Sequence, residues 1–479
     1  MTSAGIPLAL SYDDVLLAPR RSGIRSRADV DVSTRLTRGL RMAVPVVSAN
    51  MDTVTESEMA IAMARLGGIG IVHRFLSVEQ QVSEVARVKR AEALVIPDPH
   101  TIESRARLAD ALERMERHGV SGLVVVDAED RLAGMLTRRD VLLQTDPLTP
   151  VAELMTPRAR LVVGGPGTTS DEAARLLRDA RVEKLPLVAE DDRLVGLITL
   201  RDLLQRTERP EATKDERGRL AVGAAIGVRG DVVERAQALQ EAGADVLVLD
   251  IAHGHSERAI DALGRVREAV GGRTEIVAGN VATAEGARDL VAAGADGVKV
   301  GVGPGSVCTT RVVAGVGVPQ LTAVMECAEA CAAEGVPVIA DGGIRAGGDV
   351  AKAIAAGAES VMVGNLLAGT PESPGDVVRR NGTRVKVFRG MASGPAAAAR
   401  RAAEGEDGTE FIPVVPEGVE AVVSLRDATP VVLHGLVGGL RSGMSYSDAH
   451  TIPEFHGKAR FVRITPGGLR ESYPHDVTY

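Results

Sequence analysis

The chain contains no tryptophan, and aromatic residues make up only 2% of its 479 residues. This scarcity argues against the aromatic platforms on which proteins stack nucleic acid bases. The formal charge of −8 also lacks the basic excess of a nucleic-acid-binding protein. No apolar run approaches the roughly 20 residues that span a bilayer, and the first residues lack the basic and apolar pattern of a secretory signal. We therefore expect a cytoplasmic protein with no nucleic acid or membrane partner.

Cysteine is also scarce, with only Cys308, Cys327 and Cys331 in the chain. A small odd set argues against a disulfide framework and suits a reducing compartment. Cys327 and Cys331 are four residues apart in a helix-like stretch, so they share one face. They could form half of a metal site, but no further ligand cluster accompanies them, and we expect both to pack in the core.

Hydrophobic residues, in contrast, make up 45% of the chain, and from about Ala221 they form short apolar runs that alternate with alanine-rich helical segments. Examples of these runs are residues 245–250, 275–279, 337–341 and 360–364. Such runs are typical of parallel strands buried on both faces. Gly, Asp or Asn stands at the end of each, where a (β/α)₈ barrel carries its ligand-binding loops. The pattern predicts an α/β fold of the TIM barrel type, with an open doubly wound sheet as the alternative.

An internal repeat interrupts this barrel pattern between residues 96 and 206. The sequence GMLTRRD at Gly134 recurs as GLITLRD at Gly196, and a helical and a β-rich stretch precede each copy. We predict two tandem modules, at about residues 96–148 and 149–206, inserted into a barrel formed by residues 1–95 and 207–479.

The two modules resemble a tandem pair of CBS domains, named after cystathionine β-synthase. The resemblance implies a regulatory site for a purine nucleotide effector such as ATP or GTP. Its candidate ligands are Thr137, Asp140, Thr199 and Asp202. In the alternative interpretation the aspartates only cap the helices that follow, and both interpretations can hold together.

The most informative segment is the glycine-rich run Gly301–Thr310, GVGPGSVCTT, which follows the apolar run Gly297–Val300. Glycines let the backbone take unusual dihedral angles and approach a ligand closely. A cysteine in such a loop is a candidate nucleophile, because a thiolate can add to an electrophilic carbon and leave again. The alternative is a buried cysteine on a structural turn.

This run resembles the active-site loop of the IMP dehydrogenase/GMP reductase family, and the resemblance extends over nearly the whole chain. Further matching motifs, in the same order, are LSYDDVLL at 10–17, SANMDTV at 48–54, AGNVAT at 278–283, DGGI at 341–344 and GLVGGLRS at 435–442. As a set these motifs are highly specific.

The resemblance implies that Cys308 attacks carbon 2 of a purine nucleotide, GMP or IMP, with Thr310 and Glu417 as the other catalytic residues. It also implies that Asp341 contacts the ribose hydroxyls, and that Ser306 and backbone amides of glycine loops hold the 5′-phosphate. The implied substrate contacts are Ser48, Asn50, Met51, Ser306, Asp341, Gly343, Gly364, Asn365, Gly390, Met391 and Ser393.

A nicotinamide cofactor is implied beside this substrate. Its contacts would be Asp250, Ala252, His253 and Asn280. No G-x-G-x-x-G fingerprint opens a βαβ unit, which disfavours a Rossmann dehydrogenase. His253 and His255 could be metal ligands, but no third ligand is apparent.

The resemblance further implies a monovalent cation, K⁺, held by the carbonyl oxygens of Gly303, Gly305 and Cys308. Glu471 would complete this site from a neighbouring subunit, which implies a homotetramer or octamer.

The family runs two reactions, the NADPH-dependent reductive deamination of GMP to IMP and the NAD-dependent oxidation of IMP to XMP. The oxidation needs a base that activates water, and the dehydrogenases supply an Arg-Tyr pair on a flap. That flap should lie between Met391 and Glu417, where this sequence has no tyrosine. Asn50 and Phe388 are also typical of the reductases.

Two other features are typical of the dehydrogenases, namely the inserted modules and the segment GGLRES at 467–472. Because function resides in the site rather than in the fold, the resemblance favours the reductase reaction. The dehydrogenase reaction is the alternative, and a non-catalytic nucleotide sensor is a more remote one.

Overall fold

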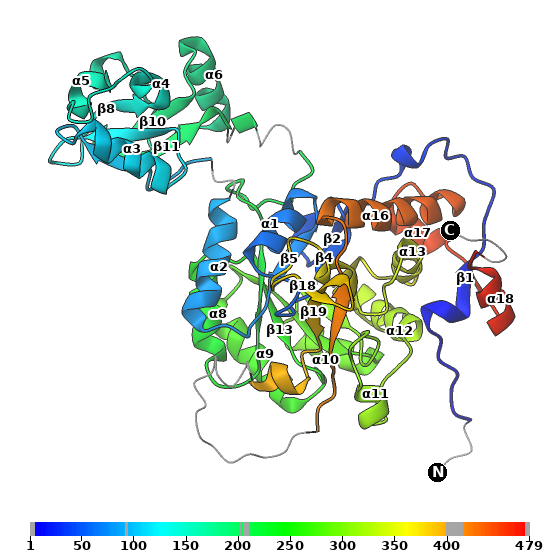
Figure 1. Cartoon of the computed structure of the whole chain (residues 1–479). Helices are drawn as coiled ribbons and strands as arrows, with labels where there is room; N and C mark the ends of the chain where they lie inside the picture. Colours follow the sequence, from blue (N-terminus) through cyan, green and yellow to red (C-terminus); the bar gives the residue numbers. More distant parts are fainter. Residues whose placement is uncertain (1–4, 92–93, 202, 205–209, 399–414, 475–479) are drawn as a thin grey trace. The chain divides into compact units, whose positions relative to one another are not determined.

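The computed structural model describes residues 5–91, 94–201, 203–204, 210–398 and 415–474 (Figure 1). Contacts within the chain divide it into two compact units. Residues 1–91 and 211–479 form the larger unit, and residues 92–210 form the smaller one.

Eight parallel strands form a closed barrel in the larger unit. In order around the barrel they are β12 (Gly223–Ile226), β13 (Val246–Asp250), β14 (Glu275–Val281), β15 (Gly297–Val300), β16 (Val338–Asp341), β17 (Ser360–Val363), β4 (Val46–Ser48) and β5 (Ile69–Val72). Almost every residue of these strands is buried, because side chains pack both inside the barrel and against the helices. The predicted (β/α)₈ barrel is confirmed, and the alternative of an open sheet is wrong.

Helices surround the barrel (Figure 1). The longer ones are α1 (Ser57–Arg65), α2 (Val78–Arg90), α8 (Val232–Glu241), α9 (Glu257–Val270), α10 (Ala284–Ala292), α12 (Gln320–Ala332), α13 (Gly347–Ala355) and α16 (Thr429–Tyr446). Side-chain caps begin several of them; the hydroxyl of Thr283, for example, accepts a hydrogen bond from Gly286 N at the start of α10. In the GLVGGLRS motif, a Cβ on Gly439 would lie 2.5 Å from the Cα of Gly347, so glycine allows α16 to pack closely on α13.

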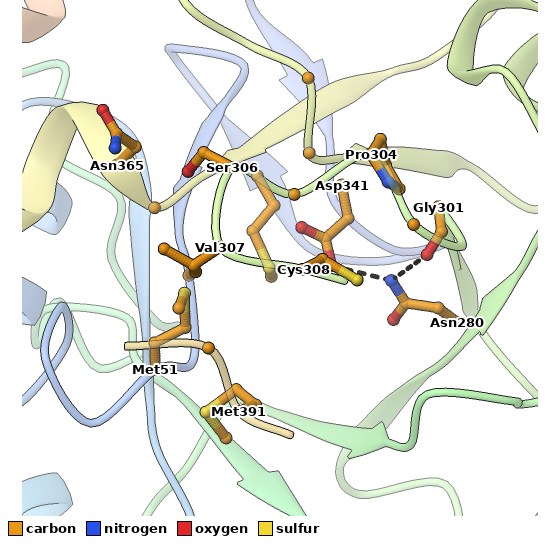
Figure 2. Close-up of a pocket in the computed structure, with 18 of the residues that line it drawn as sticks. Met51, Asn280, Gly301, Pro304, Ser306, Val307, Cys308, Asp341, Asn365 and Met391 are labelled. Carbon is orange, nitrogen blue, oxygen red and sulfur yellow. Dashed lines mark hydrogen bonds between the residues drawn. The ribbon is translucent and has the colours of Figure 1, made fainter. Parts of the chain in front are cut away.

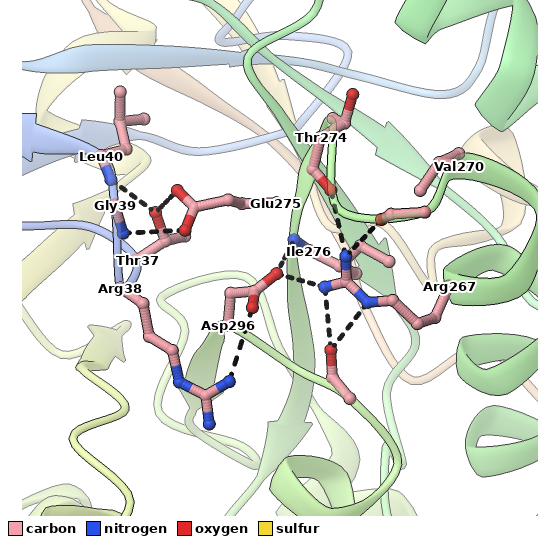
Figure 3. A network of polar contacts seen from close by, with 12 residues as sticks. Thr37, Arg38, Gly39, Leu40, Arg267, Val270, Thr274, Glu275, Ile276 and Asp296 are labelled. Atoms are coloured by element: carbon pink, nitrogen blue, oxygen red, sulfur yellow. Dashed lines mark hydrogen bonds and ion pairs between the residues drawn. The ribbon is translucent and has the colours of Figure 1, made fainter.

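Polar side chains close the amino end of the barrel at β14 and β15 (Figure 3). Asp296, just before β15, accepts from Ile276 N at 2.9 Å and forms ion pairs with Arg267 and Arg38. Glu275, the first residue of β14, accepts from Gly39 N at 2.8 Å. The segment between β2 (Thr34–Arg35) and β3 (Arg41–Met42) is thereby tied to this end.

Shorter elements complete the larger unit. They are η1 (Tyr12–Asp14), β1 (Val15–Leu17), η2 (Arg27–Asp29), α11 (Thr310–Val313), α14 (Asn365–Ala368), β18 (Val378–Arg380), β19 (Thr383–Arg389), β20 (Glu420–Ser424), α17 (Ile452–Lys458), β21 (Phe461–Arg463) and α18 (Pro466–Glu471). Strands β18, β19 and β20 form an antiparallel sheet, and β1 pairs with β21. The LSYDDVLL motif therefore forms a 3₁₀ turn followed by a short strand.

The smaller unit contains the sequence repeat. In the first copy α3 (Leu108–Arg117) leads into the hairpin of β7 (Gly122–Val126) and β8 (Leu132–Thr137), and in the second α6 (Ser170–Ala180) leads into β10 (Lys184–Val188) and β11 (Leu194–Thr199). The remaining elements are β6 (Thr101–Glu103), α4 (Arg138–Val141), α5 (Val151–Leu154), β9 (Thr156–Pro157) and η3 (Arg158–Arg160).

The two hairpins of the smaller unit have equivalent turns. Asp130 and Asp192 both take the left-handed conformation with φ of 59°. The turns also bind each other, because Leu132 N donates to Asp192 O and Leu194 N donates to Asp130 O. The repeat is therefore also a structural repeat. Within the described ranges of the whole chain, no helix combines the length and apolar character needed to cross a membrane.

Candidate active site

A cavity of about 1020 Å³ opens at the carboxyl ends of the barrel strands (Figure 2). This is the end at which (β/α)₈ enzymes carry their chemistry. The predicted site residues in its lining are Asn50, Met51, Asp250, Ala252, Asn280, Gly303, Gly305, Ser306, Cys308, Thr310, Asp341, Gly343, Gly364, Asn365, Gly390, Met391 and Glu417.

Cys308 lies half-buried on the loop after β15, two residues before α11 begins. Its Sγ lies 3.2 Å from the Oγ1 of Thr310, and its backbone N donates to Gly305 O at 3.1 Å. Gly303 has a φ of +87°, so glycine is needed for the sharp turn before the cysteine. The loop therefore holds a thiol and a hydroxyl side by side at the cavity.

Backbone pairing brings Glu417 to this loop from more than a hundred residues away. Thr309 N donates to Glu417 O at 2.9 Å, and Val419 N donates to Val307 O at 3.0 Å. Glu417 N in turn donates to Ala392 O at 3.1 Å. These backbone hydrogen bonds place Glu417 beside the cysteine loop and the segment that contains Met391, and Glu417 lines the same cavity.

A second loop, after β16, lies against the first. Gly342 and Gly343 have φ angles of +94° and +83°, and a Cβ on Gly342 would lie 2.9 Å from the Cγ of Pro304. Glycine is therefore required both for the conformation and for the close approach. Ser306 and Asn365 line the same cavity (Figure 2).

Four neighbouring strands, β13 to β16, contribute one polar group each to an ion network in the cavity wall. The ammonium of Lys299 lies 2.8 Å from Asp250 Oδ1 and 2.7 Å from Asp341 Oδ2. It also contacts the side-chain oxygen of Asn280, whose Nδ2 donates to Asp341 Oδ2 at 3.0 Å and to Gly301 O at 2.8 Å. Figure 2 shows the two hydrogen bonds of the amide nitrogen.

The charges of this network stabilise one another. Burial alone would lower the pKa of Lys299, but the attraction of Asp250 and Asp341 outweighs it and raises that pKa. Burial would likewise raise the pKa of Asp250, but Lys299, with smaller contributions from Arg74 and Asn50, outweighs burial and lowers that pKa. Both groups are therefore charged at neutral pH.

Several lining residues were missed from the sequence. They are Ser11, Tyr12, Asp13, Arg74, Lys299 and Gln320. Tyr12 is 3% exposed, and its hydroxyl is without a hydrogen-bond partner among the described residues. Burial, together with the charges of Asp349 and Asp341, raises the pKa of Tyr12. The LSYDDVLL motif was the available signal for Tyr12, since it belongs to the family pattern.

Four predicted contacts lie outside the cavity lining. Ser48 is buried and accepts from the hydroxyl of Thr55 at 2.8 Å, and Ser393 is buried with its N donating to Gly390 O at 3.0 Å. His253 is exposed, and Glu471 is exposed on α18. Their ligand contacts stay predictions.

His255, Cys327 and Cys331, which the sequence offered as possible metal ligands, lie in other environments. His255 Nε2 lies 2.8 Å from Asp289 Oδ2. Cys327 and Cys331 are buried on α12, as expected for core residues. Burial raises the pKa of Cys327 to about 12 and that of Cys331 to about 11.

Three of the four predicted effector ligands lie at or just after the ends of the two hairpins in the smaller unit: Thr137 ends β8, Asp140 lies in α4, and Thr199 ends β11. Asp140 Oδ2 accepts from Thr137 N at 2.8 Å and from Thr137 Oγ1 at 2.7 Å, so Asp140, the third residue of α4, binds the residue that caps this helix. Asp202 lies outside the described residues.

A match to a known protein family agrees with this site. The IMP dehydrogenase / GMP reductase domain matches residues 9–475. The chain belongs to the IMP dehydrogenase/GMP reductase family.

Both IMP dehydrogenases and GMP reductases are similar to this chain over nearly their full length. An inosine-5′-monophosphate dehydrogenase of Nitrosopumilus maritimus is 50% identical over 473 residues, covering 98% of each chain. A GMP reductase of Leishmania major is 50% identical over 482 residues, covering 99% of this chain and 98% of the relative.

Solved structures of GMP reductase from Trypanosoma brucei are also similar. The complex of a Cys-to-Ala variant with guanosine 5′-monophosphate has a TM-score of 0.93 and 46% identity, covering 99% of both chains. The complex with guanosine 5′-triphosphate has a TM-score of 0.82 and 42% identity, covering 97% of this chain and 99% of the other. The matched span of these reductases includes the smaller unit, so an insertion of this kind does not distinguish dehydrogenases from reductases in the family.

Proposed function

We propose that the protein is an NADPH-dependent GMP reductase, an oxidoreductase that converts GMP to IMP and ammonia in purine interconversion. The observation that carries the proposal is the meeting of Cys308, Thr310 and Glu417 at one cavity, while the segment between Met391 and Glu417 contains no tyrosine. Reduction needs no activated water, so the absent phenol removes nothing from that reaction. The similarity to reductases from Leishmania and Trypanosoma supports the same choice.

In the proposed reaction the Cys308 thiolate forms a bond to carbon 2 of GMP, and the bond from that carbon to the 2-amino group breaks. Ammonia needs a proton as it leaves, and Glu417 acts as the acid with Thr310 between it and the amino group. The product of this step is a thioimidate that links Cys308 to the nucleotide, and the sulfur leaves when IMP forms.

The nucleotide and the cofactor would share the cavity. Asp341 accepts from the ribose hydroxyls, and Ser306 with the loops at Gly343 and Gly364 holds the phosphate. Asp250, Ala252 and Asn280 lie along the wall assigned to the cofactor. A volume of about 1020 Å³ suits two ligands of this size. When bound, NADPH supplies the hydride that reduces carbon 2.

The test is nicotinamide absorbance with the purified protein in two mixtures, GMP with NADPH and IMP with NAD⁺, each with K⁺ present. We expect consumption of NADPH with IMP and ammonia formed. Formation of NADH and XMP would instead establish the second candidate, IMP dehydrogenase, which the Nitrosopumilus relative favours. A protein inert in both mixtures would support a non-catalytic nucleotide sensor.

We also propose that the smaller unit is a regulatory CBS pair that binds ATP or GTP near Thr137, Asp140, Thr199 and Asp202. The repeated hairpins support the pairing, and a reductase of this family binds guanosine 5′-triphosphate. Either nucleotide should shift activity, and Asp140→Ala should reduce the shift. An enzyme indifferent to both nucleotides would contradict this assignment.

We further propose a monovalent cation site, a homo-oligomeric assembly and a cytoplasmic location for this protein. The carbonyls of Gly303, Gly305 and Cys308 would bind K⁺, with Glu471 of a neighbouring subunit completing the site of a homotetramer or octamer in the cytoplasm. Replacement of K⁺ by Na⁺ should lower turnover, and an assay that is equally fast in both would argue against the site.

A further inference from the structure

The ion network in the cavity wall has one cation at its centre and one carboxylate on each side. Lys299 is 2% exposed, and its ammonium lies within 2.8 Å of oxygens from both Asp250 and Asp341. A lysine so deeply buried is retained only when its charge is paired. This one is paired twice, and its two ion pairs link β15 to β13 on one side and to β16 on the other.

The two carboxylates serve different ligands in the proposed reaction. Asp341 lies on the ribose side of GMP, and Asp250 lies on the cofactor side. Both aspartates line the cavity, with side chains 22% and 15% exposed. Lys299 and Asn280 both bind Oδ2 of Asp341, and no protein group in the described ranges donates to Oδ1 of that carboxylate. That oxygen is therefore available to a ligand.

Without the Lys299 ammonium, the carboxylates of Asp250 and Asp341 would face each other with no cation between them. Their oxygens lie within about 6 Å of each other, since both are bound to one nitrogen, and like charges at such a distance disfavour joint ionisation. Burial adds to this effect. Asn280 would still donate to Asp341, and Arg74 and Asn50 would still favour the charged form of Asp250. Without the ammonium between them, however, we expect the two carboxylates to move apart or to take up a proton, and so to lose the geometry in which they accept hydrogen bonds from ligands.

We propose that Lys299 is a positioning residue that holds Asp341 and Asp250 in place for the nucleotide and the nicotinamide cofactor at the same time. The proposal rests on the proposed function for the identity of the two ligands. Lys299 lines the cavity but is only 2% exposed, so we assign its effect to the two carboxylates that it holds. Its loss should therefore weaken both ligands, and each through its own aspartate.

The first test compares Lys299→Met and Lys299→Arg with the wild type in steady-state kinetics and in equilibrium binding of GMP and NADPH. For Lys299→Met we expect KM and Kd of both ligands to rise at least about tenfold. Lys299→Arg keeps the charge, so it should retain most of the affinity for both. A folded Lys299→Met protein with wild-type affinity for either ligand would overturn the proposal.

A matched control exists at the other end of the barrel. Lys89 is also buried between two aspartates, 3.1 Å from Asp215 Oδ2 and 2.6 Å from Asp245 Oδ2, and it does not line the cavity. Lys89→Met should lower the melting temperature and leave the KM of both ligands unchanged. If it raises both KM values as Lys299→Met does, the effect is general loss of structure and the proposal fails.

The most specific test combines Lys299→Met with neutralisation of one aspartate at a time. In the Lys299→Met/Asp250→Asn protein only Asp341 keeps a charge, so GMP affinity should recover while NADPH affinity stays low. In the Lys299→Met/Asp341→Asn protein the recovery should be reversed. Both double variants have one buried charge rather than two, so this comparison serves even if Lys299→Met alone does not fold. A similar defect for both ligands in both double variants would overturn the proposal.

Failure of the Lys299 proposal can be distinguished from failure of the proposed function. If the wild type oxidises IMP with NAD⁺, the reductase proposal fails, and the same variants are then compared with IMP and NAD⁺. The crossed pattern of affinities tests Lys299 in either case.

Discussion

The two ends of the barrel contain the same arrangement of charges, a buried lysine between two aspartates, in different surroundings. At the amino end, Lys89 of α2 pairs with Asp215 and Asp245. Asp245 also accepts from Val222 N at 2.7 Å, and Asp215 accepts from Arg219 N at 2.8 Å. The carboxylates there are held by protein groups, and neither lines the cavity of the candidate active site.

At the carboxyl end, the lysine pairs as closely, but its aspartates line the cavity. The difference shows that a buried ion pair is not by itself a sign of function. Its role depends on whether a ligand can reach the charges that the pair holds. In a (β/α)₈ barrel the two ends divide these roles between stability and chemistry.

The largest expected loss of turnover follows substitution of Cys308, at the carboxyl end of the barrel. Cys308→Ala should lower turnover at least about 10⁴-fold, because the covalent bond to carbon 2 cannot form. Binding of GMP, measured by calorimetry, and the melting temperature should stay close to wild type, since the side chain is half-buried and its loop is held by backbone hydrogen bonds. Turnover near the wild-type rate would remove the covalent mechanism.

A smaller loss is expected from Glu417→Gln. The amide keeps the size of the side chain but is not an acid, so release of ammonia should slow about 10²- to 10⁴-fold. The KM for GMP should change only a few-fold, because backbone atoms of this segment hold the loop. Rapid-quench measurement of ammonia with GMP and NADPH checks this, and an unchanged rate constant would contradict the role assigned to Glu417.

These two residues illustrate what the sequence could predict. The barrel followed from the apolar runs, and the cysteine loop followed from its glycines. Glu417 could be assigned only through the resemblance to the family. Its position depends on pairing between residues 417–419 and 307–309, and no local pattern predicts contacts over such a separation.

Lys299 was missed although its signal was present. It interrupts the otherwise apolar run Gly297–Val300 in a strand that the barrel fold buries on both faces. A charged residue there needs a partner. The neighbouring strand ends supply Asp250, Asn280 and Asp341, each of which had been assigned to a ligand separately. What the sequence could not supply was the geometry that joins the three through one ammonium.

At the amino end, substitution should affect stability alone. Arg267 donates to Gly294 O at 2.9 Å and to Gly271 O at 2.8 Å, and it forms an ion pair with Asp296 (Figure 3). Arg267→Met leaves these acceptors without their donor, so we expect the free energy of unfolding to fall by about 3 kcal/mol. Urea denaturation measures the loss. At a temperature where the variant is folded, kcat/KM should equal that of the wild type, and a lower value would mean that the two ends are coupled.

The smallest expected effect comes from chemical modification, which should distinguish the three cysteines. Cys308 lies at the cavity, whereas Cys327 and Cys331 are buried on α12, where burial raises their pKa values to about 12 and about 11. Because a thiol reacts as the thiolate, at pH 8 the reactive fraction of the two buried groups is about one in a thousand or less. Iodoacetamide should therefore modify Cys308 alone in the native enzyme, and GMP should slow the reaction. Peptide mass spectrometry after denaturation gives the control, since all three sites are then labelled. Early labelling of Cys327 in the native protein would mean that α12 opens readily, and that the helical layer around the barrel is less stable than its packing indicates.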